Sequence, residues 1–477
     1  MRLISSAIRL RSFMPNTAGK KISRIFGSCV FLLLSAQIVI GCVWGILNFT
    51  SFQEFPESAE MILLSSGLSL KSDTSVIYPA LLLIIRTLTL RGPVRFFEVM
   101  YVLQLALAFV SWYTFAVKVL PFEKRFLRVG FALAVVTNPF AMQCHLAVLE
   151  FSFVSSFLCL LVAFAVRFSL ERKKVGSRYD LNTAVKHVCV TSLFWMLLSL
   201  TRKEFVFIGF FCILILLYHI CVNLKVGNKI TKLSPVIVFI VFFAAIHFID
   251  GAFRTSSPLL PTDIIKRSAY VRIAWTEDIA NKYIWPEHVM YTVGRDYMGE
   301  VMFDPGLVKT GFTEAVEEVY GRKETSDNFF KWFLYSFKDN KKGIIKDALV
   351  DAAGYVFPPA ETLAALDGKT LPGFATGNYD VMRRNVPAFT KYYLRLSSII
   401  YIFLALAAVL VMIVRKEIFR RMRAFAPAAL VTVLSSAVYT FYGSNVWDHK
   451  KALFTTCIWI GLFAALCIRS ISGKEEA

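Results

Sequence analysis

Long apolar runs, separated by short polar segments, dominate the chain. A helix that crosses a bilayer needs about 20 consecutive, mostly apolar residues. Ten runs meet this requirement: 25–48, 96–117, 126–143, 146–167, 184–201, 204–224, 233–251, 393–414, 424–442 and 452–470. The pattern predicts an all-α polytopic membrane protein with about ten transmembrane helices.

Two polar segments between the runs are much longer than the rest, and they set the domain organisation. The predicted parts are a basic cytoplasmic N-terminus (1–24), helices one to seven with an acidic first outer loop at 49–95 (25–251), an extracytoplasmic helical loop domain (252–391), helices eight to ten (392–470) and a cytoplasmic tail (471–477). Apolar residues recur at helical spacing around Val316 and again around Ile345, so the loop domain is expected to be helical.

Composition and charge agree with a membrane protein. Hydrophobic residues make up 56% of the chain and charged residues 18%, against about 25% charged in soluble domains. This excludes a soluble enzyme, a disordered chain and a disulfide-stapled secreted domain. The net charge of +20 would suggest nucleic acid for a soluble chain. Here Lys and Arg flank the apolar runs, as cytoplasmic loops require, so we expect a lipid bilayer and no nucleic acid as partner. Binding of anionic lipid is the alternative use of this charge.

The first outer loop holds the most informative acidic residues. Glu54, Glu57 and Glu60 follow the first predicted span, and Pro56 suits the first turn of a helix. Three carboxylates at a membrane surface could form an acid/base site or bind a divalent cation. They could also simply stabilise a helix N-terminus. The spacing is not diagnostic for a metal, so no metal and no cofactor is expected.

Several short motifs, in this order, resemble the GT-C superfamily of membrane glycosyltransferases. Glu57 stands in a Pro-Glu-Ser-Ala-Glu stretch like the family's Pro-Asp-Ser-Ala-Glu, and a Tyr78-Pro79 pair follows. Residues 200–204 resemble the family's Leu-Thr-Arg-Pro-Glu turn, and residues 448–451 stand where relatives have Asp-x-Arg-Tyr. The sequence departs from the family pattern at Glu57 (usually Asp), at Lys203 (commonly Pro) and at Lys450, which replaces an Arg and lacks the following Tyr.

The resemblance implies an enzyme that uses a polyprenyl-phosphate-linked sugar as donor. The acceptor would be an envelope glycan, lipid or protein with a hydroxyl on the extracytoplasmic side. Glu57 would be the catalytic base, and Glu54 and Glu60 are the alternative candidates for this role. By analogy with the family, a single carboxylate acting as base implies inversion at the anomeric carbon. The donor phosphate would be bound by Arg202, Lys203, His449, Lys450 and Lys451. Arg202 and Lys203 could instead simply extend to water from a helix end, and Lys450 and Lys451 could be part of a solvated turn.

Two further residues are candidates for an internal cavity. Glu150 lies within a predicted span, where a carboxylate is costly and must face a partner or a cavity. His145 lies in the turn before it, and a buried, hydrogen-bonded structural histidine is the alternative there.

Three other functions remain open from the sequence. A polymerase or ligase of lipid-linked polysaccharide would depend on Arg residues of the long loop, such as Arg267 and Arg383. A transporter or flippase would carry charges deep in several spans, and a catalytically silent relative would need none of these sites. A multi-pass protein of a bacterial cytoplasmic (inner) membrane is the expected location.

Overall fold

The computed structural model describes part of the chain. The described residues are 32–47, 76–89, 93–120, 122–138, 151–174, 181–202, 233–253, 320–346 and 388–414, with separate positions between 141 and 150 and between 205 and 220, and at 266 and 349. They are almost entirely helical, and no strand occurs among them. The predicted all-α class is therefore confirmed for this part of the chain.

By its contacts the chain divides into two compact units. One comprises residues 1–253, 386–433 and 454–477, and the other comprises residues 254–385 and 434–453. The helices described in the first unit are Leu32–Leu47, α4 (Ile77–Leu88), α5 (Pro93–Val119), α6 (Arg125–Val136), α8 (Phe151–Lys174), α9 (Leu181–Thr201), α12 (Ser234–Phe253) and α22 (Ala388–Val414).

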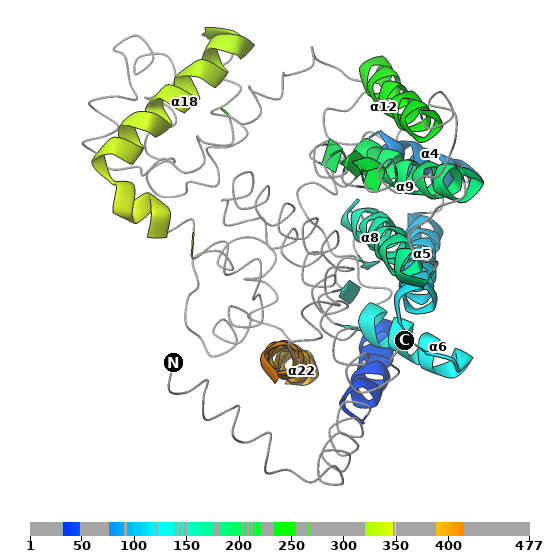
Figure 1. Cartoon of the computed structure of the whole chain (residues 1–477). Coiled ribbons are helices and arrows are strands. Elements are labelled where there is room, and N and C mark those ends of the chain that lie inside the picture. The colour runs from blue at the N-terminus through cyan, green and yellow to red at the C-terminus, as the bar shows by residue number, and fades with distance from the viewer. Residues whose placement is uncertain are drawn as a thin grey trace. The chain divides into compact units, whose positions relative to one another are not determined.

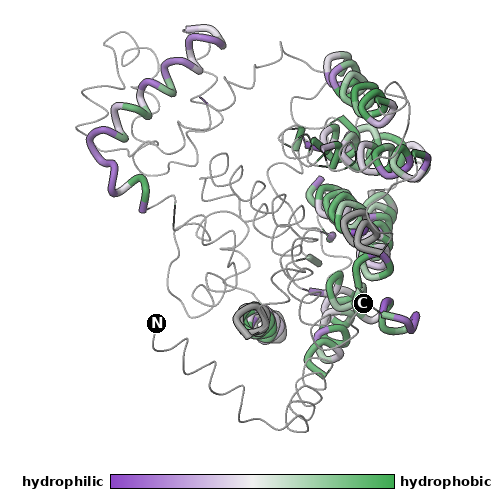
Figure 2. The backbone as a smooth tube through the Cα atoms, in the orientation of Figure 1, coloured by the Kyte–Doolittle hydropathy of each residue, from purple (hydrophilic) through white to green (hydrophobic). Residues whose placement is uncertain are grey.

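Three of the described helices are long and apolar enough to cross a membrane, namely Phe96–Val119 within α5, α9 and α12. Shorter apolar helices are Leu32–Leu47, α4, Phe151–Arg167 within α8 and Arg395–Ala407 within α22. Figure 2 shows that α12 is hydrophobic along most of its length. These helices indicate a membrane protein. The count of ten spans, the cytoplasmic termini and the extracytoplasmic loop domain stay predictions, and two of the ten runs, 424–442 and 452–470, lie outside the described residues.

Two helices differ from the sequence pattern. The run 126–143 was expected to be one helix, but α6 ends at Val136. The Thr137 hydroxyl donates to the carbonyl of Leu133 at 2.7 Å, and Asn138 precedes a proline, which disfavours helical backbone. The second difference is α4, a helix inside the predicted outer loop. It buries Tyr78, Leu82 and Ile85.

The core of the first unit is a row of helices in the order α12, α9, α8, α5 and α6, each packed on the next. Figure 1 shows this row on one side of the drawing. Aromatic rings form several of the contacts. Trp195 of α9 stacks on Phe239 of α12 with ring centroids 5.4 Å apart, and Phe115 of α5 stacks on Phe131 of α6 at 6.3 Å. Buried Ser152, Ser155 and Ser156 lie in the first turns of α8, where small side chains allow close helix packing.

The Leu32–Leu47 helix contacts α6 and α22, which are distant in sequence. Gln37 Nε2 donates to the carbonyl of Ala134 at 2.6 Å. Tyr393 of α22 donates its hydroxyl to the carbonyl of Thr137, and its ring lies 5.7 Å from that of Trp44. Carbonyls freed at the end of α6 are thus satisfied by side chains of two other helices.

The second unit is described mainly through α18 (Arg322–Asp339). Gly321 has φ of +76° at its N-terminus, a conformation that favours glycine. The helix buries Phe329 and Trp332, and Figure 2 shows hydrophilic and hydrophobic stretches alternating along it. Apolar spacing had predicted a face containing Ile344, Ile345 and Leu349. Ile344 is buried, whereas Ile345 and Leu349 are exposed.

Candidate functional site

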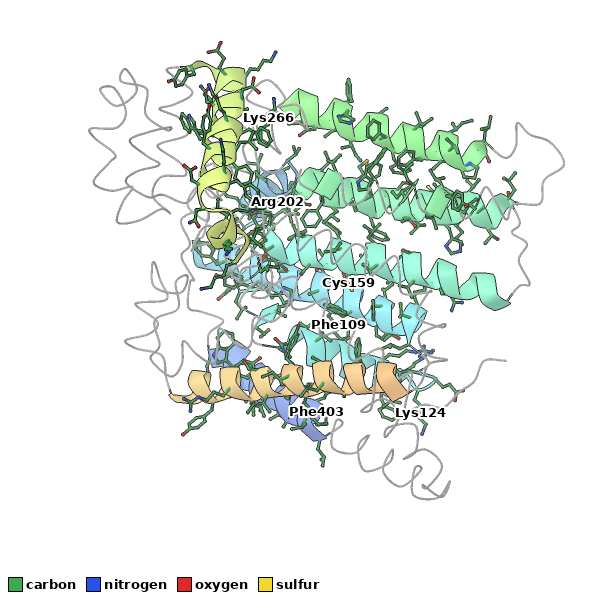
Figure 3. The ribbon with its side chains drawn as sticks, turned by 60° about the vertical axis from the view of Figure 1, so that its left-hand side comes forward. Phe109, Lys124, Cys159, Arg202, Lys266 and Phe403 are labelled. Atoms are coloured by element: carbon green, nitrogen blue, oxygen red, sulfur yellow. The ribbon has the colours of Figure 1, made fainter. Side chains whose placement is uncertain are left out.

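The candidate site lies where the start of α8 meets the end of α9. Glu150 directly precedes Phe151, the first residue of α8, and Arg202 directly follows Thr201, the last residue of α9. Glu150 Oε1 lies 2.9 Å from Arg202 Nε. The Arg202 guanidinium also lies 4.9 Å from the ring centroid of Phe151, so a carboxylate and an aromatic face hold it. Figure 3 labels Arg202 at this end of α9.

Both charges are largely removed from solvent. The side chain of Glu150 is 3% exposed and that of Arg202 is 12% exposed. The contact is a close ion pair in which the Nε–H of Arg202 does not meet hydrogen-bond geometry. The helix dipoles favour this arrangement, because an anion is stabilised at the N-terminus of α8 and a cation at the C-terminus of α9.

A chain of polar contacts connects the start of α8 to α5 and α4. The ring nitrogen Nδ1 of His145 lies 2.8 Å from Ser152 Oγ. Gln104 of α5 donates from Nε2 to the carbonyl of His145 at 3.0 Å. Tyr78 of α4 points its hydroxyl at Gln104 Oε1 at 3.5 Å, a weak contact that is longer than the usual O–H···O hydrogen bond. We refer to Tyr78, Gln104, His145, Glu150, Ser152 and Arg202 as the polar cluster.

The backbone also ties α4 to this end of the bundle. The amide of Val76, just before α4, donates to the carbonyl of Leu200 at 2.9 Å. Leu200 is in the last turn of α9, where helix carbonyls have no partner within the helix. Tyr78 packs edge-on against Phe153 of α8, with centroids 5.6 Å apart. Three helix ends therefore meet at the polar cluster.

His145 is neutral in this setting. It lies between α6 and α8, at a position with helical backbone, and is 1% exposed. Burial lowers the pKa of its imidazole to about 3, because a charged ring loses its hydration there. The Nδ1 contact with Ser152 fits a structural histidine, which was the alternative interpretation of this residue from the sequence.

Two buried atoms of the polar cluster lack a partner. Within the described part of the chain, neither Glu150 Oε2 nor His145 Nε2 has a hydrogen-bond partner. Buried polar atoms in native proteins nearly always have one. The polar cluster is thus incomplete as it stands, at two atoms near the first turn of α8.

The structure brings together three of the residues singled out from the sequence. Arg202, Glu150 and His145 all belong to the polar cluster. The remaining candidates lie outside the described residues: Glu54, Glu57, Glu60, Lys203, His449, Lys450 and Lys451.

Sequence reasoning did not single out Gln104, Ser152 or Phe151. Gln104 carried a usable signal, since it is an amide in the middle of an apolar run and is fully buried. Ser152 and Phe151 carried none, because neither residue type stands out at the start of an apolar helix. In the described part of the chain, no three His, Cys, Asp or Glu side chains lie close enough together to hold a metal ion.

The chain matches no protein-family model, and neither the curated proteins nor the solved structures give a significant match.

Proposed function

We propose that the chain is a membrane glycosyltransferase of the GT-C type. It would move a sugar from a polyprenyl-phosphate donor to a hydroxyl of an envelope glycan, lipid or protein on the extracytoplasmic side. The observation that carries the proposal is the buried Arg202–Glu150 pair at the common end of α4, α8 and α9. Arg202 is one of the five residues that the family resemblance assigns to the donor phosphate, and the only one of them among the described residues.

Three features support a donor phosphate at this end of the bundle. A guanidinium matches phosphate geometry and keeps its charge at any working pH. Arg202 is held by Glu150 and by the ring of Phe151, so its position is set before a ligand binds. In the predicted topology the start of α8 and the end of α9 both face the extracytoplasmic side, where the acidic loop also lies.

The proposed reaction follows from these roles. Glu57 takes the proton of the acceptor hydroxyl as its oxygen bonds to the anomeric carbon. The bond from that carbon to the phosphate oxygen breaks, and polyprenyl phosphate leaves with an additional negative charge. Arg202 stabilises this charge as it develops, which favours the transition state over the ground state. The attack from the opposite face inverts the anomeric carbon, and no metal is required.

Sugar transfer in proteoliposomes tests the proposal. Donors would be a panel of radiolabelled polyprenyl-phosphate hexoses and pentoses, with an envelope extract as acceptor. We expect Glu57→Gln to lower transfer about 100-fold or more, since a general base contributes on this scale. Arg202→Lys keeps the charge but loses the planar fork, and it should raise the donor KM.

Lys186 provides a matched control for Arg202. It is an exposed cation in the first half of the same helix, α9, far along the helix from Arg202. Lys186→Ala should leave transfer unchanged. Full transfer by Glu57→Gln would remove the catalytic assignment, and no transfer with any donor would remove the proposed function.

A further inference from the structure

The two oxygens of the Glu150 carboxylate differ in their contacts. Oε1 faces Arg202 Nε at 2.9 Å, whereas Oε2 is buried and has no hydrogen-bond partner among the described residues. An ion pair that only joins two helices would be most stabilising if both carboxylate oxygens accepted hydrogen bonds from the guanidinium in a bidentate arrangement. An ionised oxygen kept from water without a donor is costly to the fold.

His145 places a second unsatisfied atom beside the same turn of α8. Its Nδ1 contacts Ser152, two residues after Glu150, and its Nε2 is buried without a partner in the described part of the chain. The hydrogen on a neutral imidazole sits on one nitrogen only, so Nε2 either donates or accepts. Near the start of α8 there are thus two buried polar atoms, the acceptor Glu150 Oε2 and the ring nitrogen His145 Nε2, which can be a donor or an acceptor.

The chemistry of these atoms defines the missing group. A carboxylate oxygen only accepts, so its partner must bring a donor. The neighbouring guanidinium attracts an anion. A molecule that fits both carries hydroxyl groups a few atoms from a phosphate, which describes a glycosyl phosphate.

We propose that Glu150 Oε2 accepts a hydrogen bond from a hydroxyl of the donor sugar whose phosphate Arg202 binds. This inference rests on the proposed function and gives Glu150 the role of a specificity-determining residue. Arg202 would then set affinity for every phosphodiester, and Glu150 would set the preference for a sugar over a plain alkyl group.

Binding of two kinds of probe to the full chain in nanodiscs tests this. The first kind is citronellyl hexosyl phosphodiester in the gluco, galacto and manno forms. The second is citronellyl methyl phosphodiester, which has the same charge and no sugar hydroxyls. We expect the unaltered protein to bind at least one hexosyl probe about tenfold more tightly than the methyl probe.

The variants separate the two roles. Glu150→Gln keeps an acceptor but loses its charge, so the preference should fall to about twofold to threefold. Arg202→Gln should weaken both probes by a similar factor and keep the ratio. Glu98→Gln, a carboxyl change on α5, is the control and should change nothing.

Two results would overturn the inference. One is a Glu150→Gln protein that keeps the wild-type ratio. The other is equal binding of the methyl probe and of every hexosyl probe, which would leave a water molecule as the partner of Oε2. If Glu150→Gln does not fold, deoxyhexosyl probes on the unaltered protein decide instead, because removing the correct hydroxyl should abolish the preference. The binding measurement needs no turnover. The predicted role of Glu150 can therefore be refuted while sugar transfer is observed, and it can be supported while no transfer is observed.

Discussion

A buried ion pair is a costly way to join two helices, and this makes the Glu150–Arg202 contact informative. Each charge loses hydration when it is buried, and mutual attraction offsets that loss only when the geometry is good. Here one carboxylate oxygen has no partner within the described residues. Helix dipoles at both ends reduce the cost. The pair is therefore not optimal for stability.

Removing one charge should cost more than removing both. Glu150→Leu leaves Arg202 buried beside Phe151 without its counter-ion, and we expect a loss of about 3 kcal/mol in the free energy of unfolding. The Glu150→Leu/Arg202→Leu double variant should lie within about 1 kcal/mol of the unaltered protein. Thermal unfolding in detergent, followed by tryptophan fluorescence, measures these two proteins and the Arg202→Leu single variant, which completes the cycle. A double variant as unstable as the sum of its single changes would show that the two residues do not act as a pair.

The sequence identified both partners of this pair but not the pair itself. Glu150 was recognised because a carboxylate within an apolar run is expensive, and Arg202 because it stands in a motif resembling a family turn. Their contact depends on α8 and α9 lying side by side with these two ends together. Neither spacing nor composition contains that information. The roles assigned to Glu57 and to the cations at 449–451 still rest on the sequence alone, because these residues lie outside the described part of the chain.

At the scale of elements, uniformly apolar runs were predicted well and mixed segments poorly. The boundaries of α5, α9 and α12 agree with the runs 96–117, 184–201 and 233–251 to within a few residues. By contrast, α4 was not expected as a helix, and within the loop domain, which was expected to be helical, the pattern did not locate α18. In α18 the buried aromatics Phe329 and Trp332 recur at helical spacing, but intervening charges mask the pattern. Polar segments need tertiary contacts to select one conformation, and those are not visible in a single sequence.

Two glycines of the Leu32–Leu47 helix offer a matched test of how this helix packs. A Cβ at Gly41 would clash with the backbone carbonyl of Thr137, at the contact that also receives Tyr393. A Cβ at Gly45 would meet only the flexible end of Met142. We expect Gly41→Ala to cost about 1–3 kcal/mol, as overpacking does. Gly45→Ala should be near neutral, since alanine also favours the helix. Thermal unfolding of the two variants measures the difference, and equal stability would contradict the described contact between this helix and α6.

At the scale of the whole molecule, the direction of each helix links the site to the membrane. The contact between Glu150 and Arg202 places the start of α8 and the end of α9 at one end of the bundle. The charge pattern of the sequence assigns that end to the outside, because the other ends of α8 and α9 adjoin the basic segment at 167–186. A lipid-linked phosphate donor would reach the polar cluster only if this assignment is correct.

Cysteine labelling tests the orientation directly. In a background with the native cysteines replaced, Lys331→Cys in α18 and Phe126→Cys at the start of α6 both supply exposed positions. A membrane-impermeant maleimide added to intact cells should label the first, which belongs to the predicted extracytoplasmic segment, and miss the second, which adjoins a predicted cytoplasmic one. After the cells are permeabilised, both positions should react, which controls for accessibility. The reverse pattern would move the polar cluster to the cytoplasmic side, where the proposed donor is not presented, and would exclude the proposed reaction even if every contact at Arg202 were correct.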